Sequence, residues 1–340
     1  MEQHELTNGR LLDENGNLNE AGYAFSLVKE YKREDIKAGK SRIKEWDYYY
    51  FGNHDIGIAL TIADNSYMDL CSATFFDFKK RTYCQNSRMH AFSNGKRNLP
   101  PTSEIGDVKY LDNRVLFIFN NDGNKRELVG SYENFRGKEK LTFHLTVTKT
   151  RDDTMVIATP FNKDKHFYYN QKSNNLICSG DIKLGDKRYR VENMQGVLDW
   201  GRGVWTRVNT WYWASMNDVC DGHTVGFNLG YGFGDTSKAS ENMFFFDDKA
   251  FKMDDVIFEI PKNKAGKEEF MKTWRMLSRN KDINLTFTPL IHRKGGGNAI
   301  VIHSVQNQIF GIYSGTFTVE GKTYKIENCY GFAEKVYNRW

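Results

Sequence analysis

The chain has 340 residues, of which 39% are hydrophobic and 14% aromatic, and its formal net charge is +5. This hydrophobic content is sufficient for packed cores and, with only five prolines, excludes a largely disordered chain. The lysines and arginines are mixed with acidic residues and form no basic stripe, which argues against nucleic-acid binding.

The N-terminal segment, residues 1–20, has no apolar stretch of the kind found in signal peptides. Elsewhere no apolar run approaches the length that a membrane span requires. We therefore expect a cytoplasmic protein without a membrane span. Residues 21–34 (AGYAFSLVKEYKRE) are compatible with one helix, or equally with an extended wrap across the end of a barrel.

Short β-rich runs alternate with turn sequences along most of the chain, as in VLFIFN followed by NDGN. Leu141, Phe143 and Leu145 recur with the period of two that is typical of an antiparallel strand with one buried face. The segment TWRMLSRNKDINLTF has some helical spacing, but we predict a hairpin with RNKD as its turn and with Trp274 and Met276 on one strand face.

Residues 179–205 resemble residues 314–340 without a gap, at an offset of 135 residues. Eight of the 27 aligned positions are identical, whereas about two are expected at roughly 6% per position. Chance similarity between glycine-rich hairpins is the alternative, but a fixed period favours duplication of a whole small domain. We predict an N-terminal domain with an N-terminal wrap over residues 1–190, and a C-terminal domain over residues 191–340.

Two domains built from short antiparallel strands must protect their sheet edges, and closing each sheet into a barrel removes those edges. A barrel of about eight strands can enclose one small ligand, as lipocalins do. We therefore predict an all-β fold of two tandem lipocalin-like (calycin-type) antiparallel β-barrels packed side by side. Two β-sandwiches are the structural alternative.

The five cysteines are odd in number, widely spaced and without a C-x-x-C pair, so we expect them to be reduced packing residues. No H-E-x-x-H, P-loop or G-x-S-x-G motif is present, and no G-x-G-x-x-G follows a strand. We therefore predict no metal and no organic cofactor.

Several segments resemble the family catalogued as domain of unknown function 2804. They are RIKEWDYYYF (42–51), ALTIADNSYMDLCSATFFDF (59–78), LDWGRGVWTRVNTWYWASM (198–216), GFNLGYGFGDTSKASENMFFFDDKAF (226–251) and INLTFTP. More distantly, the D-W-G-R-G-x-W … W-x-W-A-S block is similar to the hydroxyneurosporene synthase (carotenoid hydratase) and AttH-like group, which is related to natural-product cyclases. The resemblance implies two lipocalin-like barrels in tandem and supplies no reaction. Where the family usually has tryptophan before a polar turn, this chain has Tyr231 and Phe233, which keep a ring but lack an indole N–H.

The D-W-G-R-G block places acidic and basic side chains among tryptophans, and Trp211 and Trp213 share a strand face by their spacing. A carboxyl desolvated among large rings has a raised pKa and can act as a general acid, and ring faces can stabilise a developing cation. The pattern predicts hydration, isomerisation or cyclisation of a small apolar or aromatic molecule. The predicted participants are Asp199 and Glu241 as proton donors or acceptors, Arg202 as charge partner, and Trp205, Trp211 and Trp213 as walls. The alternative is a structural Asp199–Arg202 salt bridge beside core tryptophans.

Other candidate residues belong to binding rather than to catalysis. Glu241 and Asn242 follow a glycine-rich turn, where they can also cap that turn, and Asn228 adds a polar contact. Trp46, Asp47 and Tyr49 belong to an aromatic cluster that more often lines a barrel, although Asp47 and Tyr49 would share a face as a ligand-binding site.

The second copy of the repeat keeps only part of the pattern. Glu334 preserves the carboxylate of Asp199, while Tyr337 replaces Arg202 and Lys335 replaces the tryptophan of D-W-G-R-G. Two further functions stay open from the sequence. One is a non-catalytic carrier or sensor, and the other is a carbohydrate-binding or carbohydrate-active protein, because sugars also pack on tryptophan and tyrosine beside carboxylates.

Overall fold

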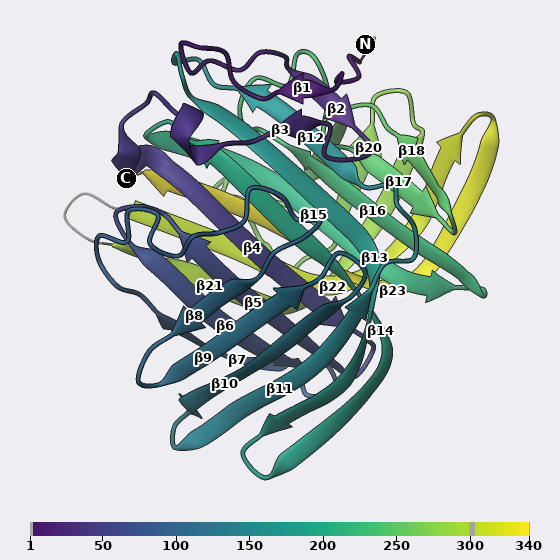
Figure 1. Cartoon of the computed structure of the whole chain (residues 1–340). Helices are drawn as coiled ribbons and strands as arrows, with labels where there is room; N and C mark the ends of the chain where they lie inside the picture. Colours follow the sequence, from purple (N-terminus) through teal and green to yellow (C-terminus); the bar gives the residue numbers. More distant parts are fainter. Residues whose placement is uncertain (1–2, 299–302, 340) are drawn as a thin grey trace.

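The structure is a computed structural model, which describes residues 3–298 and 303–339 and consists almost entirely of β-strands (Figure 1). The predicted all-β class is therefore confirmed. Within the described ranges the helical elements are two short 3-10 turns, and residues 21–34 form an extended wrap instead of an α-helix. The two 3-10 turns are η1 (Arg33–Asp35) and η2 (Lys40–Arg42). The wrap contributes β3 (Lys29–Glu30), which pairs with β1 (Gly9–Arg10) in a small parallel sheet of two strands.

The first large sheet has twelve strands and curls around the larger apolar core, which includes Phe51, Leu145 and Trp200. Its strands are β2 (Gly22–Ala24), β4 (Ile43–Gly52), β5 (Ile56–Asp64), β6 (Asp69–Asp77), β7 (Thr82–Arg88), β8 (Val108–Leu111), β9 (Val115–Asn121), β10 (Arg126–Arg136), β11 (Glu139–Thr148), β12 (Met155–Pro160), β13 (Phe167–Leu184) and β14 (Lys187–Val204). The order is β7-β6-β5-β4-β14-β13-β11-β10-β9-β8, with β12 beside β13 and β2 beside β12.

The second sheet has nine strands around a separate core that includes Phe227 and Tyr313. Its strands are β15 (Val208–Cys220), β16 (His223–Tyr231), β17 (Met243–Phe246), β18 (Lys249–Lys252), β19 (Val256–Glu259), β20 (Trp274–Ser278), β21 (Ile283–Asn298), β22 (His303–Val319) and β23 (Lys322–Arg339). The order is β18-β17-β16-β15-β23-β22-β21-β20-β19. The predicted hairpin of β20 and β21 is confirmed, with Trp274 and Met276 buried on one face.

Each large sheet is a curled, open half-barrel. Among the described residues no ladder joins the end strands β7 and β8, or β18 and β19, so the closed tandem barrels stay a prediction. The first sheet ends at Val204 and the second begins at Val208, so the predicted boundary at residue 190 lies within β14. The division into domains likewise stays a prediction.

The two repeated segments have the same local geometry. The hairpins β13–β14 and β22–β23 each contain a register shift, next to Gly180 in one and Gly315 in the other. These glycines have φ values of 144° and 148°, and a Cβ on either would lie 2.1 Å from a carbonyl oxygen of the neighbouring strand. The serine before each glycine accepts a hydrogen bond from the amide of an asparagine 14 residues later. Repeated residues therefore build the same bulge twice.

A polar seam joins the sheets where β13 meets β15 and β16. The side chain of Asn174 donates to the hydroxyl of Ser215 over 3.0 Å and to Oδ1 of Asn217 over 2.9 Å. The neighbouring Asn175 donates from its side chain to the carbonyl oxygen of Val225 over 2.8 Å. These side chains are buried, so the seam fixes how the first sheet meets the second.

Cys220 and Cys329 form a disulfide between the end of β15 and β23. The prediction that all five cysteines are reduced is therefore wrong. The two residues lie 109 positions apart in the sequence and meet only because β15 pairs with β23, so their spacing carried no signal. Cys71, Cys84 and Cys178 are free.

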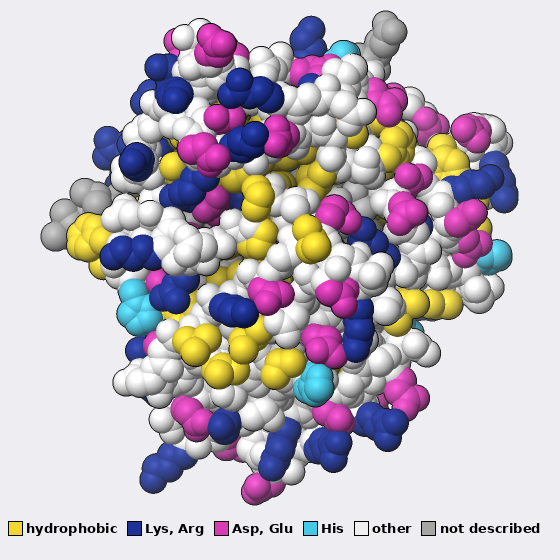
Figure 2. Space-filling model, viewed as in Figure 1, with side chains coloured by type: hydrophobic (Ala, Val, Ile, Leu, Met, Phe, Trp, Pro, Cys, Tyr) yellow, Lys and Arg dark blue, Asp and Glu magenta, His cyan; other side chains and the backbone are white. Residues whose placement is uncertain are grey.

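The exposed face in Figure 2 shows lysine and arginine side chains mixed with aspartate and glutamate, without a basic stripe. The face shown therefore has the mixed charges that the sequence indicates. Over residues 3–298 and 303–339, no helix has the length and apolar character needed to cross a membrane.

Candidate active site between the two sheets

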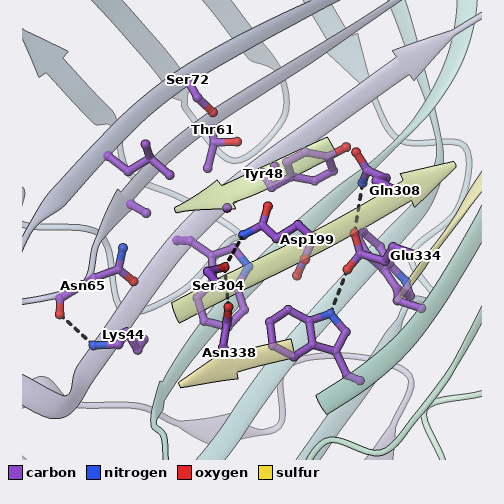
Figure 3. A pocket seen from close by; sticks show the side chains of 18 of the residues that line it. Lys44, Tyr48, Thr61, Asn65, Ser72, Asp199, Ser304, Gln308, Glu334 and Asn338 are labelled. Atoms are coloured by element: carbon purple, nitrogen blue, oxygen red, sulfur yellow. Dashed lines mark hydrogen bonds between the residues drawn. The ribbon is translucent and has the colours of Figure 1, made fainter. Parts of the chain in front are cut away.

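A cavity of about 850 Å³ lies between the two large sheets. Alternation along β4 places Lys44, Trp46 and Tyr48 on the cavity side, whereas Asp47 and Tyr49 point to the other face of the sheet. Figure 3 shows polar side chains from both sheets directed into this space. Its aromatic lining consists of Trp46, Tyr48, Tyr67, Tyr168, Trp205, Trp211, Trp213 and Phe233.

The tryptophan walls form a connected set of edge-to-face contacts. Ring centroids lie 5.3 Å apart for Trp46 and Trp205, 4.8 Å for Trp205 and Phe233, and 5.2 Å for Trp211 and Phe233. Trp211 and Trp213 both line the cavity, so their predicted shared face is confirmed. The indole N–H of Trp205 is buried and has no hydrogen-bond partner among the described residues.

Gly201 explains part of the D-W-G-R-G motif. It pairs with Trp46 across the β14–β4 ladder, and a Cβ on Gly201 would lie 2.0 Å from Cζ2 of that indole. The preceding residue, Trp200, points to the first core and is completely buried. The glycine therefore leaves the space that the Trp46 ring occupies in the cavity wall.

Asp199 lies in a buried ion pair at the centre of the cavity. Its Oδ2 is 2.8 Å from Nζ of Lys172, and its Oδ1 accepts a hydrogen bond of 2.6 Å from the side chain of Asn170. The ammonium group of Lys172 also lies 3.9 Å from the ring centroid of Trp213. Both carboxylate oxygens of Asp199 therefore have a polar partner, one a cation and the other an amide N–H.

Glu334 is a second carboxyl in this cavity, and its surroundings shift its pKa. Its Oε1 accepts the indole N–H of Trp211 over 2.8 Å, and its Oε2 accepts the amide N–H of Gln308 over 3.1 Å. Burial nevertheless raises the pKa of Glu334 to about 7, with a further increase from the charge of Asp199 and an opposing effect of Lys172. Near neutral pH the Glu334 carboxyl is therefore partly protonated.

Glu241 is a third carboxyl in the cavity lining. Burial raises its pKa, while the charge of Lys172 lowers it. The side chain of Asn228 donates to the carbonyl oxygen of Glu241 over 2.7 Å and to its Oε2 over 3.3 Å, and accepts the indole N–H of Trp213 over 2.7 Å. Asn228 therefore connects this carboxyl to the tryptophan wall.

Asn242 has a structural role. Its Oδ1 accepts the amide N–H of Gly230 over 2.7 Å, and its side-chain nitrogen donates to the carbonyl oxygen of Asp254 over 2.9 Å. It is completely buried and does not belong to the cavity lining.

Arg202 is not the charge partner of Asp199, which corrects both sequence-based interpretations of this pair. The two residues are separated by three positions and so lie on opposite faces of β14. Arg202 pairs with Asp47 at 3.1 Å inside the first sheet and donates to the carbonyl oxygens of Trp46 and Pro100, each over 2.8 Å. Lys172, and not Arg202, lies beside Asp199.

Asp47 and Tyr49 share a face as predicted, but that face belongs to the first core. Tyr49 packs edge to face on Phe119, with ring centroids 5.3 Å apart. Neither residue lines the cavity between the sheets. Trp46 is the member of this predicted group that does.

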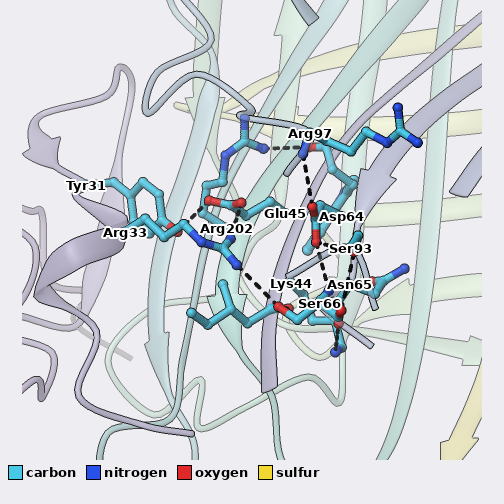
Figure 4. Close-up of polar contacts among 12 residues, drawn as sticks. Tyr31, Arg33, Lys44, Glu45, Asp64, Asn65, Ser66, Ser93, Arg97 and Arg202 are labelled. Atoms are coloured by element: carbon cyan, nitrogen blue, oxygen red, sulfur yellow. Dashed lines mark hydrogen bonds and ion pairs between the residues drawn. The ribbon is translucent and has the colours of Figure 1, made fainter. Parts of the chain in front are cut away.

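A second cavity, of about 900 Å³, lies beneath the N-terminal wrap. Its lining includes Glu45, which accepts the hydroxyl of Tyr31 over 2.7 Å and pairs with Arg33 (Figure 4). These side chains satisfy one another, and we assign no chemistry to this cavity.

Sequence reasoning missed Lys172 altogether and saw Glu334 only as the counterpart of Asp199. Lys172 belongs to NQKSNN (170–175), six consecutive polar residues that are all buried in β13. A polar run of this length within a β-rich segment is a usable signal for a site, because buried polar side chains need partners. In the part of the chain that the structure describes, no cluster of three or more histidine, cysteine, aspartate or glutamate side chains is placed to hold a metal.

The model of the family described as "Domain of unknown function (DUF2804)" matches residues 3–340. A solved structure of a protein provisionally assigned as AttH, from Nitrosomonas europaea, is 13% identical with a TM-score of 0.58, covering 92% of this chain and 98% of that chain. The structure of kievitone hydratase from Nectria haematococca is 9% identical with a TM-score of 0.51, covering 98% of this chain and 97% of that chain. No curated protein matches the sequence. At these identities the structural likeness shows the fold alone.

Proposed function

We propose a function for this chain, which belongs to the DUF2804 family, as an acid–base catalyst that acts on a small, largely apolar or aromatic molecule held between its two sheets. Membership confirms the resemblance inferred from the sequence, and the family description names no reaction. One observation carries the proposal. A carboxyl with a pKa of about 7, Glu334, and an ion-paired carboxylate, Asp199, line the same tryptophan-walled cavity.

The cavity favours a particular class of ligand. Its volume of about 850 Å³ lies within the range of roughly 300–1,000 Å³ that small-molecule sites have. The rings of its walls suit an apolar or aromatic body. The buried N–H of Trp205 has no partner among the described residues, so a ligand oxygen beside it would remove a cost of about 1–3 kcal/mol. We therefore infer an apolar or aromatic molecule that carries an oxygen group.

Hydration is the simplest reaction that these groups support. The protonated Glu334 donates its proton to one carbon of an alkene, whose electron pair forms the new C–H bond and leaves a cation at the other carbon. A water oxygen then bonds to that carbon and releases a proton to Asp199 or Glu241, so that the net change is addition of one water. A partly protonated carboxyl near neutral pH is suited to this role.

Isomerisation and cyclisation begin with the same cation. In isomerisation the cation loses a neighbouring proton, and in cyclisation a second double bond of the substrate attacks it. The ring faces of Trp46 and Trp211 are available to stabilise the cation, whereas Lys172 already occupies one face of Trp213. Similarity to the fold of a hydratase makes hydration the first reaction to test.

The test uses the purified full chain and a panel of oxygenated aromatic alkenes and enones. Incubation in heavy-oxygen water reveals hydration as a mass gain of one labelled water, and incubation in D2O reveals isomerisation as deuterium bound to carbon. We expect Glu334→Gln to abolish turnover while ligand binding persists, and Asp199→Asn to slow it. Glu192→Gln, on an exposed side chain of β14, serves as the control. Equal turnover by Glu334→Gln would refute the role of Glu334, and a bound ligand that is always recovered unchanged would identify a carrier.

We also propose that the two sheets derive from one duplicated lipocalin-like barrel, with the two copies divided between Val204 and Val208, where the first sheet ends and the second begins, and not at the predicted residue 190. The identical bulges next to Gly180 and Gly315, each with the same serine–asparagine hydrogen bond, support this origin. A structure-based alignment of the two halves tests the proposal, because unrelated sheets would not superpose over the strands that flank those bulges.

A further inference from the structure

We propose that Arg293 binds a carboxylate group of the ligand in the cavity between the sheets, so that this ligand is an apolar or aromatic carboxylic acid. The inference rests on the proposed function only for the place of the ligand, and it specifies the chemical class of that ligand. It gives a role to Arg293, which takes no part in the acid–base steps described above.

The guanidinium group of Arg293 is held from both sheets. Arg293 belongs to β21 and lines the cavity. Its Nε donates to the hydroxyl of Thr74 over 3.3 Å, and its Nη1 donates to Oε1 of Gln308 over 3.1 Å. Thr74 lies on β6 of the first sheet and Gln308 on β22 of the second, and both residues are buried. These bonds give the guanidinium group a defined place in the cavity wall.

The positive charge of Arg293 has no carboxylate partner in the part of the chain that the structure describes. Two of the five N–H donors of its guanidinium group bind neutral oxygens, which leaves three donors, including both on Nη2, for a ligand. The side chain is only partly exposed, so water stabilises its charge less than it stabilises a surface arginine. A ligand carboxylate supplies a counter-charge and two acceptor oxygens, which fit parallel N–H groups of arginine.

The carboxyl groups of the cavity are less suited to a ligand cation than Arg293 is to an anion. Asp199 already has Lys172 as its cation, at 2.8 Å. Burial raises the pKa of Glu241 and of Glu334, which favours their uncharged forms. A phosphate group would bring up to two negative charges close to these carboxyls. A carboxylate, with a single charge, therefore fits the cavity better than a phosphate does.

The other basic residues in the cavity lining have different surroundings. Lys294 and Arg339 are exposed, so water stabilises their charges. Lys44 donates to the carbonyl oxygen of Asn65 over 2.8 Å, and Figure 3 shows this pair on another side of the cavity from Gln308. Binding of the carboxylate by one of these residues is a distinct outcome of the test below.

Hydrogen bonds connect Arg293 to the proposed proton donor. Gln308, which accepts from Arg293, donates to Oε2 of Glu334 over 3.1 Å (Figure 3). Oε1 of Glu334 accepts the indole N–H of Trp211 over 2.8 Å. A ligand bound through its carboxylate to Arg293 therefore has its apolar body beside Glu334 and the tryptophan walls. The charge of Arg293 lowers the pKa of Glu334, and a bound carboxylate offsets that charge, which favours the protonated acid.

Matched ligands isolate the contribution of the ligand charge. The full chain is titrated by calorimetry at pH 7.5 with benzoate, 2-naphthoate and biphenyl-4-carboxylate, and with the primary amide of each acid. Each acid and its amide have nearly the same shape, but only the acid is charged. We expect at least one of the acids to bind at least about tenfold tighter than its amide, because charge-assisted hydrogen bonds are stronger than neutral ones.

Substitutions then locate the group that recognises the charge. Arg293→Met should abolish the preference for the acid over its amide, and this ratio within one variant is insensitive to a general change of cavity shape. Arg293→Lys keeps the charge but loses the parallel donors, so it should retain part of the preference. Arg275→Met, at an exposed position of β20, should retain all of it. Glu334→Gln should keep the preference while turnover is lost, so the two proposals can fail separately.

The wild-type chain alone can overturn the proposal, even if Arg293→Met fails to fold. Amides that bind as tightly as the acids, acids that do not bind, or 2-naphthylmethylammonium that binds more tightly than 2-naphthoate would each do so. A preference that survives in Arg293→Met but is lost in Lys44→Met or Arg339→Met would also overturn it, because the carboxylate would then lie on another cation.

Discussion

The raised pKa of Glu334 predicts a specific dependence of stability on pH. In the folded chain burial raises this pKa from 4.5 to about 7. Between these values the folded state keeps a proton that the unfolded state releases, so the free energy of unfolding falls as the pH rises through this window. At about 1.4 kcal/mol per pKa unit, the total loss is about 3 kcal/mol, complete above pH 8.

Glu334→Gln removes this titration and provides the perturbation. The amide has the shape of the protonated carboxyl but cannot ionise, so the variant should not lose the stability that the wild type loses. The amide nitrogen also faces Trp211 or Gln308, which are both donors to Glu334, and this mismatch adds a constant cost at every pH. The quantity to compare is therefore the change with pH and not the stability at one pH.

Urea unfolding at several pH values between 4.5 and 8.5 measures this quantity. The free energy of unfolding of Glu334→Gln, minus that of the wild type, should increase by about 3 kcal/mol across the range. Glu192→Gln, on the exposed face of β14, should show no such trend. A difference that stays constant with pH would mean that Glu334 is ionised throughout, and the argument for a general acid at this position would fail.

Three further variants, one of them also combined with a compensating substitution, test the charge pairs and the cavity wall. Lys172→Met leaves Asp199 buried without its cation and should cost about 3–5 kcal/mol, seen as a lower midpoint of thermal unfolding. Arg202→Met should destabilise the fold by a similar amount, and adding Asp47→Asn to that variant should recover part of the lost stability. A loss of ligand affinity without a loss of stability would contradict a structural role for Arg202. Gly201→Ala should displace the indole of Trp46, which packs on Gly201, and should lower the free energy of unfolding by about 1–3 kcal/mol. Titration calorimetry should also show weaker ligand binding. Unchanged affinity would mean that Trp46 does not contact the ligand.

Alternation along single strands was sufficient to predict some features of the site. Trp211 and Trp213 differ by two positions and both reach the cavity, as their spacing indicates. The same rule, applied to Asp199 and Arg202, would have separated them, because they differ by three. That error came from treating nearness in the sequence as nearness of side chains.

Other features depend on which strands become neighbours, and no local pattern encodes that. Glu334 meets Trp211 because β23 pairs with β15, and Cys329 meets Cys220 for the same reason. Lys172 lies in a polar run that the sequence shows, but its place beside Asp199 depends on the pairing of β13 with β14. The pairing of distant strands therefore determines which charged side chains meet, while local periodicity determines which aromatic side chains face the cavity.

The division of the centre between the sheets has a consequence for how its reactivity can change during evolution. Lys172 and Asp199 come from the first sheet, and Glu334 comes from the second. A small slide of one sheet on the other would change the distance between Glu334 and the Lys172–Asp199 ion pair while all three residues are retained. Under the proposed function, substitutions along the polar seam, such as at Asn174 or Ser215, would therefore change the chemistry without replacing any of these three residues.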